Sequence, residues 1–205
     1  MTSRQPARRV GLFGGSFDPV HNAHLALATS ALAALALDEL CWIPAGAPWQ
    51  KARRLAPAAQ RADMVSLAIG HEARFRLEPC ELERSGPSYT IDTVLELQRR
   101  EPATQWLLLL GQDQLAGLHT WHRWRELVER VELAVANRAG EPPRIATELA
   151  GTRLSLTEVP LPAMAISSTD IRARVAAGLD IAALVPAPVA RYIAEHGLYR
   201  NPLRS

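Results

Sequence analysis

The sequence predicts an α/β protein built on one doubly wound parallel sheet with helices on both faces. Short apolar segments of strand length alternate along the chain with longer segments of helical periodicity. The run at residues 106–110 is apolar throughout, as in a central parallel strand that is covered on both faces. Strands that alternate with helices are joined by crossover connections, which produce a parallel sheet.

Length and composition favour a single globular domain. The chain has 205 residues, 48% hydrophobic and 21% charged, and its net charge of +2 gives no basic surface for nucleic acid. No apolar segment has the length of a membrane span or a signal peptide. Cys41 lies in an apolar run without metal-site spacing, so we expect a buried thiol and a cytoplasmic protein. We expect residues 1–8 to be a flexible tail and residues 9–200 to form the domain.

The first four elements follow from apolar runs and helix signals. Residues 9–13 predict a short buried strand, and residues 22–37 predict a helix because they are rich in alanine and leucine. Residues 39–44 predict a second strand that ends at a proline. Residues 57–69 predict an amphipathic helix, which a proline opens.

The middle of the chain repeats this alternation. Residues 75–82 predict a third strand, and residues 88–100 carry apolar side chains at helical spacing. The strand at 106–110 is followed by a predicted helix at 124–130. Residues 133–136 predict another buried strand.

The chain closes with a strand and a helical C-terminal end. Residues 154–159 predict the last strand, and residues 166–178 and 188–196 predict two helices. Gly178 and Gly197 stand at the ends of these helices, where glycine commonly stops a helix.

Turn residues follow four of the predicted strands. Gly14, Pro44, Gly111 and Asn137 all fall at carboxyl ends of strands. Ligands of doubly wound sheets bind beyond these ends. We therefore expect the polar and aromatic residues that follow them to meet in one cleft.

Residues 14–24 read Gly-Gly-Ser-Phe-Asp-Pro-Val-His-Asn-Ala-His and predict a site for a nucleotide triphosphate. Two glycines leave the turn open to close approach by a ligand. Asp18-Pro19 has the composition of a helix start, and free N–H groups at such a start favour anions. His21 and His24 share one face of a helical turn, and we expect phosphate charge to favour their protonated form. Metal binding is the alternative for these histidines, but no further ligand stands at suitable spacing.

Several motifs together resemble one family of enzymes. Residues 14–24 closely resemble the GG(S/T)FDPxHxGH signature of nucleotidyltransferases with the His-x-Gly-His motif. Residues 166–172, Ile-Ser-Ser-Thr-Asp-Ile-Arg, are similar to that superfamily's second phosphate motif, ISSTxIR. Between them lie Pro-Ser-Tyr-Thr at 87–90, Gly-Gln-Asp at 111–113 and Thr-Trp-His at 120–122. In this order the set resembles bacterial nicotinate-nucleotide adenylyltransferases over residues 10–199.

The resemblance implies a Rossmann-like fold and transfer of the adenylyl group of ATP to nicotinate mononucleotide by direct in-line attack. Deamido-NAD and pyrophosphate are the implied products. Mg²⁺ is expected to be held by ATP phosphates and water, without dedicated protein ligands. The implied catalytic residues are His21, His24, Lys51 and Arg172. The implied ATP-binding residues are Gly14, Gly15, Ser16, Phe17, Gly111, Asp113, Arg138, Ile166, Ser167, Ser168 and Thr169. The implied nicotinate-nucleotide-binding residues are Ser88, Tyr89, Thr90, Trp121 and His122.

Simpler interpretations stand beside these roles. Lys51, the only lysine of the chain, is by itself an ordinary surface charge. One hydroxyl of residues 167–169 is expected to cap the following helix, and Trp121 has helix packing as its alternative. Ala23 replaces the family's glycine, which helical backbone would tolerate. Pantetheine-phosphate adenylyltransferase and a non-catalytic nucleotide-binding regulator are the alternative functions.

Overall fold

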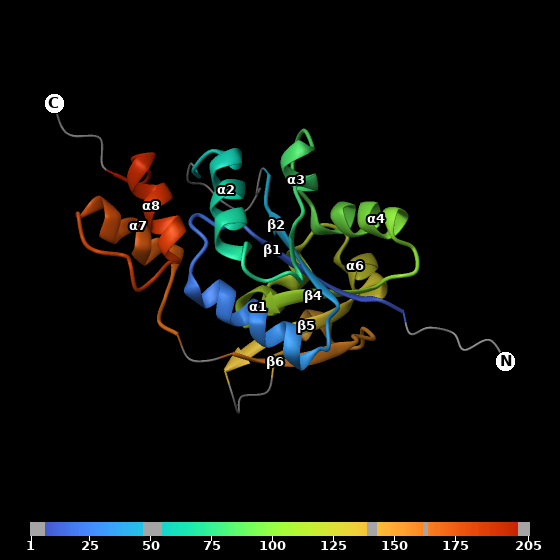
Figure 1. The fold of residues 1–205 in the computed structure, drawn as a ribbon. Helices are drawn as coiled ribbons and strands as arrows, with labels where there is room; N and C mark the ends of the chain where they lie inside the picture. The colour runs from blue at the N-terminus through green and yellow to red at the C-terminus, as the bar shows by residue number, and fades with distance from the viewer. Residues whose placement is uncertain (1–6, 47–54, 139–142, 162–163, 201–205) are drawn as a thin grey trace.

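The computed structural model of the chain describes residues 7–46, 55–138, 143–161 and 164–200, and its core is one parallel sheet (Figure 1). Within these residues the sheet has six strands in the order β3-β2-β1-β4-β5-β6. The strands are β1 (Arg9–Gly15), β2 (Glu39–Pro44), β3 (Phe75–Leu77), β4 (Gln105–Gly111), β5 (Glu132–Arg138) and β6 (Leu156–Leu161). This order is that of a doubly wound, Rossmann-like sheet, so the predicted fold class is confirmed.

Helices pack on both faces of the sheet. One face carries α1 (Asn22–Ala34), α2 (Ala58–Ile69), α7 (Ser168–Ala176) and α8 (Ala187–Glu195). The other face carries α4 (Thr90–Arg100), α5 (Gln112–Ala116) and α6 (Trp124–Arg130). In Figure 1, α7 and α8 lie together at one end of the molecule beside α2, which gives the predicted helical C-terminal end.

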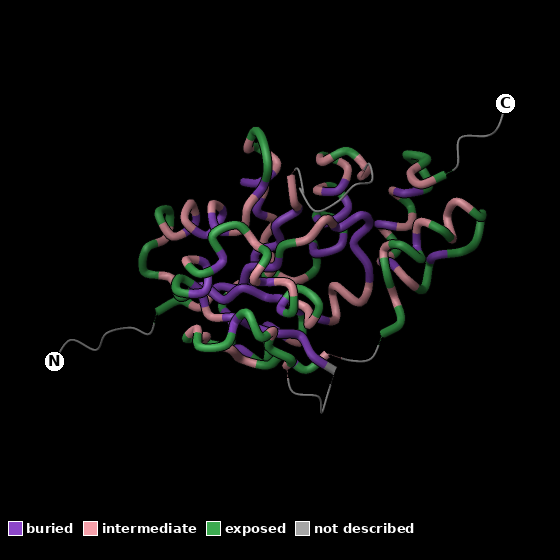
Figure 2. The backbone as a smooth tube through the Cα atoms, turned by 180° about the vertical axis from the view of Figure 1, so that it is seen from behind, coloured by how far each residue is buried: buried purple, intermediate pink, exposed green. Residues whose placement is uncertain are grey.

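The central strands are buried on both faces, as their apolar sequence predicts. In β4, Leu107 and Leu109 pack against the α1 side, whereas Leu108 and Leu110 pack against the α4 side. Figure 2 shows the buried backbone gathered in the middle of the molecule. The sheet is therefore a rigid platform whose carboxyl edge presents the loops.

Two regions differ from the predicted elements. The third strand ends at Leu77 instead of residue 82, and residues Cys80–Glu83 form the short helix α3. Glu78 still donates its N–H to the carbonyl of Trp42, but the next residue, Pro79, has no N–H with which to continue the ladder. The sequence pattern also gave no indication of α5 or of the 3₁₀ turns η1 (Leu118–Thr120) and η2 (Thr147–Leu149).

Other local expectations are confirmed. Gly178 and Gly197 have positive φ of 72° and 60° where α7 and α8 end. Cys41 and Cys80 are buried free thiols, and burial raises the pKa of Cys80 to about 12. Among the residues that the structure describes, no helix combines the length and apolar character needed to cross a membrane. The expected cytoplasmic location and the flexible tail over residues 1–8 stay predictions.

Candidate active site

A cavity of about 440 Å³ opens where the two central strands separate. β1 and β4 pair only from Arg9 opposite Gln105 to Leu12 opposite Leu108. Each of the two strands stays paired with its other neighbour for longer: β1 pairs with β2 as far as Gly15 opposite Pro44, and β4 pairs with β5 as far as Gly111 opposite Ala136. The ends of β1 and β4 thus diverge at the point where the strand order reverses. This is the switch point at which ligands of doubly wound sheets bind.

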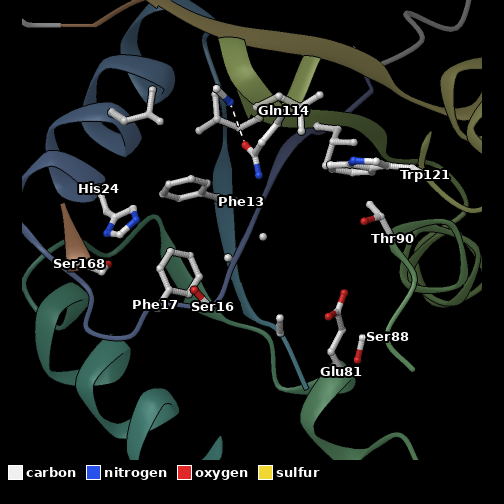
Figure 3. A pocket seen from close by; sticks show the side chains of 18 residues that line it. Phe13, Ser16, Phe17, His24, Glu81, Ser88, Thr90, Gln114, Trp121 and Ser168 are labelled. Atoms are coloured by element: carbon white, nitrogen blue, oxygen red, sulfur yellow. Dashed lines mark hydrogen bonds between the residues drawn. The ribbon is translucent and has the colours of Figure 1, made fainter. Parts of the chain in front are cut away.

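The cavity brings together predicted residues from five separate segments (Figure 3). Ten predicted site residues line it: Gly14, Gly15, Ser16, Phe17, His24, Ser88, Thr90, Gly111, Trp121 and Ser168. In Figure 3, His24 and Ser168 lie at one end, whereas Thr90 and Trp121 lie at the other. The cavity therefore has a histidine and hydroxyl end, and an aromatic end.

The glycines at the end of β1 have different local reasons. A Cβ on Gly14 would meet no atom within 4 Å, so the Gly14 backbone faces open space. A Cβ on Gly15 would lie 3.0 Å from the ring of Phe17, which packs directly over that residue. Phe17 itself has a φ of 45°, which turns the chain sharply after the strand. Together these residues leave backbone accessible to a ligand at the cavity wall.

His21 and His24 form a stacked pair at the start of α1. Their ring centroids are 3.6 Å apart and the ring planes differ by 21°. The backbone N–H of His21 donates to Nδ1 of His24 at 3.2 Å. A neutral His24 ring must then carry its proton on Nε2, so it can donate from that atom. Of the two histidines, His24 lines the cavity, whereas His21 is buried and is not among the lining residues.

Protonation of both histidines was expected from the charge of bound phosphate, and it stays a prediction. Burial lowers the pKa of His21 to about 4, against an opposing hydrogen bond, so its ring is neutral at pH 7. Two charged rings at this stacking distance would also repel each other. The pair is thus one buried neutral ring beneath one ring that faces the cavity.

The predicted start of the first helix at residue 22 is confirmed, but the helix-start role suggested for Asp18-Pro19 is wrong. Helix α1 begins at Asn22 with His21 as its N-cap, and the Asp18–Pro19 peptide is cis. The buried Asp18 carboxylate instead accepts from the hydroxyl of Tyr199 at 2.8 Å and from the N–H of Ala56 at 3.2 Å. Asp18 therefore ties the loop after β1 to the C-terminal segment.

The second phosphate motif begins α7 and divides between two cavities. Ser167 caps the helix by accepting from the N–H of Asp170 at 3.1 Å, as predicted. Ser168 donates to the carbonyl of Pro19 at 2.9 Å and lines the first cavity. Thr169 and Arg172 line a second cavity of about 530 Å³.

Arg172 lies in the second cavity and is not among the residues that line the first. Its guanidinium donates to the carbonyl of Asp18 at 2.7 Å and to the hydroxyl of Thr169 at 3.1 Å. Ser168 and Arg172 thus bind the consecutive carbonyls of Pro19 and Asp18, one from each cavity. The two phosphate motifs are joined through this contact.

The aromatic end of the cavity is built by the start of α4 and the segment before α6. Thr90 is the first residue of α4, and helix starts leave N–H groups without partners inside the helix. The rings of Tyr89 and His122 lie 4.3 Å apart, and a salt bridge joins Arg123 to Asp92 at 3.5 Å. These contacts hold the segment that carries Trp121 against the start of α4.

Several predicted residues lie elsewhere or outside the described ranges. Asp113 is exposed on α5, and Ile166 packs against the core on the α1 side. Tyr89 and His122 contact each other and are not among the lining residues. Lys51 lies outside the described residues, as does the side chain of Arg138. The roles proposed for these residues stay predictions.

The cavity also contains residues that sequence reasoning missed. Gln114 accepts from the N–H of Gly111 at 2.9 Å, and Figure 3 shows its amide nitrogen on the cavity side. Glu81 and Ala45 line the other wall. The signal for Gln114 was its spacing of three from Gly111, which suits a side chain that caps its own helix.

The chain is similar to a known protein family and to several relatives that are described as members of one enzyme group. The model of the cytidylyltransferase-like family matches residues 12–174. A probable nicotinate-nucleotide adenylyltransferase of Methylibium petroleiphilum is 52% identical over 96% of this chain and 95% of its own length. A protein of the same description from Bordetella petrii is 52% identical over 94% of this chain and all of its own length.

Solved structures share the fold at low sequence identity. The nicotinic acid mononucleotide adenylyltransferase of Plasmodium falciparum, complexed with NaAD, has a TM-score of 0.77 at 20% identity and covers 94% of this chain and 97% of its own. A putative nicotinate-nucleotide adenylyltransferase of Vibrio parahaemolyticus has a TM-score of 0.71 at 18% identity, with coverage of 96% and 98%. With relatives that match nearly end to end, the chain belongs to the cytidylyltransferase-like family and, within it, to the nicotinate-nucleotide adenylyltransferases.

Proposed function

We propose that this chain transfers the adenylyl group of ATP to nicotinate mononucleotide in NAD biosynthesis, forming nicotinate adenine dinucleotide and pyrophosphate. The observation that carries the proposal is the two-ended cavity between β1 and β4. One end has open glycine backbone, His24 and Ser168, which suit phosphates. The other end has Trp121 and the start of α4, which suit an aromatic acid.

The reaction needs alignment of two anions more than it needs a strong base. A phosphate oxygen of the mononucleotide attacks the α-phosphorus of ATP, and the bond from that phosphorus to the bridging oxygen of the β-phosphate breaks. Pyrophosphate leaves with the electron pair of that bond. A phosphate monoester is already nucleophilic at neutral pH, so positioning and charge stabilisation are the tasks left to the protein.

The proposed roles follow the two ends of the cavity. His24 donates from Nε2 to phosphate oxygens, and His21 supports its ring from below. Arg172, which lines the second cavity and donates to the Asp18 carbonyl, keeps the role that the family motif implies and stabilises the leaving pyrophosphate. Lys51, Asp113 and Arg138 keep the roles that the family motifs imply, facing the triphosphate, the ribose and the adenine.

Recognition of the acid is proposed for the start of α4 and Trp121. The nicotinate ring would stack on the indole of Trp121, and its carboxylate would accept from backbone N–H groups near Thr90 and His122. A nicotinamide in that place would turn its own N–H₂ toward donors. This arrangement favours the acid over the amide.

We further propose that Mg²⁺ enters with ATP. Within the described ranges, no three His, Cys, Asp or Glu side chains gather in a way that could hold a metal ion. The Asp18 carboxylate accepts from Ala56 and Tyr199. In this proposal phosphate oxygens and water hold the ion, and the charge that it supplies offsets that of the β- and γ-phosphates.

A reaction panel tests the function. The protein is incubated with ATP, Mg²⁺ and one acceptor: nicotinate mononucleotide, nicotinamide mononucleotide or phosphopantetheine. We expect pyrophosphate and dinucleotide with the first acceptor, at a kcat/KM well above that with either of the others. Preference for the amide or for phosphopantetheine would overturn the substrate assignment. ATP binding without pyrophosphate release would indicate a regulator.

A further inference from the structure

Arg61 of α2 is a buried cation that binds the backbone around the cavity. Its side chain donates to the carbonyls of Ser16 at 2.8 Å, Ala45 at 2.7 Å, Gly46 at 3.3 Å and Ala56 at 3.1 Å. The residue is 1% exposed and is not among those that line the cavity. Arg61 therefore contacts both the loop after β1 (residues 16–18, here called the phosphate-side loop) and the residues at the end of β2.

Glu81 of α3 is a buried carboxylate on the aromatic side. It accepts from the hydroxyl of Thr93 at 2.8 Å, and the hydroxyl of Ser88 and the N–H of Gly46 also favour its charged form. Burial raises its pKa, and these hydrogen bonds oppose that shift. Glu81 thus ties the end of β2 to the start of α4.

The two side chains lie at opposite ends of one peptide group. The carbonyl of Ala45 accepts from Arg61, and the N–H of Gly46 in the same peptide favours the charged form of Glu81. A Cβ on Gly46 would lie 2.0 Å from the carbonyl oxygen of Glu81, so Gly46 and Glu81 are in direct contact. In a trans peptide these two groups point in opposite directions, so the peptide lies between a buried cation and a buried anion. The N–H of Ala45 also donates to the carbonyl of Gly15 at 2.8 Å, which links this peptide to β1.

Arg61 also orients the phosphate-side loop. It binds the Ser16 carbonyl, and the N–H of Phe17 in the same trans peptide therefore points away from the guanidinium. Phe17 is part of the cavity wall. This orientation turns a backbone donor from the interior toward the place where phosphate is expected.

We propose that Arg61 and Glu81 are a pair of positioning residues that fix the phosphate side and the aromatic side of the cavity relative to each other through the Ala45–Gly46 peptide. This inference rests on the proposed function and adds two residues to it. Buried charges are costly, and apolar replacements can be as stable, so stability alone gives little reason for both. Arg61 acts on the ATP side, and Glu81 acts on the side of the nicotinate mononucleotide.

The test separates the two Michaelis constants. Arg61→Lys keeps the charge but loses the planar fork, and Glu81→Gln keeps the shape but loses the charge. We expect Arg61→Lys to raise the KM for ATP roughly tenfold and Glu81→Gln to raise the KM for nicotinate mononucleotide roughly tenfold, with the other KM changing less. Because both act through one peptide, the double variant should deviate from the product of the single effects.

Controls and alternative outcomes keep the test decisive. Arg74→Lys and Glu83→Gln make the same chemical changes at exposed positions and should leave both KM values unchanged. Unfolding by urea is measured for each variant, and Glu81→Gln alone decides if Arg61→Lys does not fold. The proposal would be overturned if the KM values of the variants were unchanged, or if the KM for ATP and the KM for nicotinate mononucleotide rose equally and in proportion to the loss of stability. If wild-type protein forms no dinucleotide, the proposed function fails instead.

Discussion

At the residue scale, a hydrogen bond from His21 and ring contacts with His21, Phe13 and Phe17 orient the ring of His24. His21 stacks beneath it, and Phe13 and Phe17 lie at centroid distances of 5.9 and 5.1 Å. The N–H of His21 donates to Nδ1, which leaves Nε2 as the donor of the neutral ring. A donor with a fixed direction loses little freedom when charge develops on a phosphate.

Replacing His24 by alanine tests this role. We expect kcat to fall about 100- to 1,000-fold, the usual loss for one transition-state donor, while the fold remains. Steady-state kinetics and circular dichroism measure the two effects. His196→Ala removes an exposed histidine that stacks on Tyr192 and should leave kcat unchanged. A rate for His24→Ala equal to wild type would exclude the ring from the mechanism.

Local motifs predicted the residues that face the cavity better than those that support it. Gly14, His24 and Ser168 stand in contiguous motifs, so their neighbours in sequence identify them. Arg61 and Glu81 act through contacts between distant segments, and such contacts exist only after folding. One signal for Arg61 was available, because it shares the buried stripe of α2 with Met64 and Val65.

At the scale of elements, the cap of α1 depends on tertiary contacts that the local sequence pattern does not contain. Asp18-Pro19 has the composition of a helix start, but the Asp18 carboxylate accepts hydrogen bonds from Ala56 and Tyr199 and does not cap the helix. The helix begins three residues after Pro19. Ala23 lies inside α1, so the helical conformation expected for it is confirmed. The third strand is shorter than predicted, because Pro79 has no N–H with which to continue the hydrogen bonds of the sheet. Short apolar runs in the sequence nevertheless predicted each strand of the described sheet.

The N-cap of α1 makes stability depend on pH. The His21 ring has a pKa of about 4 in the folded chain and about 6.5 when unfolded, so between these values the unfolded chain binds more protons. The free energy of unfolding should therefore rise with pH across this window. We expect wild type to lose roughly 3 kcal/mol relative to His21→Asn between pH 7 and pH 4.

Urea unfolding of both proteins at matched pH values measures this difference. Asparagine cannot titrate there and is a favourable N-cap, so it serves as the reference. The comparison removes the contributions of all other titrating groups that the two proteins share. A stability difference that stays constant from pH 4 to pH 7 would contradict the buried neutral ring.

At the scale of the whole molecule, the sheet itself creates the site. β1 and β4 are neighbours whose crossovers run to opposite sides, and their pairing stops at Leu12 and Leu108. The resulting cavity takes its histidine and hydroxyl end from β1, α1 and α7 and its aromatic end from α4 and the segment before α6. The alternation of strands and helices in the sequence predicted the class of the sheet, which is doubly wound and parallel. Placement of Thr169 and Arg172 in a second cavity depends on tertiary packing and was not predictable.

We expect one cavity to hold both halves of the dinucleotide product, and a crystal structure of the protein with nicotinate adenine dinucleotide would show where each half binds. We predict the pyridine ring stacked on Trp121, its carboxylate at the start of α4, and a phosphate oxygen within hydrogen-bonding distance of His24 Nε2. A pyridine ring bound away from Trp121, or phosphates bound away from His24, would contradict this arrangement.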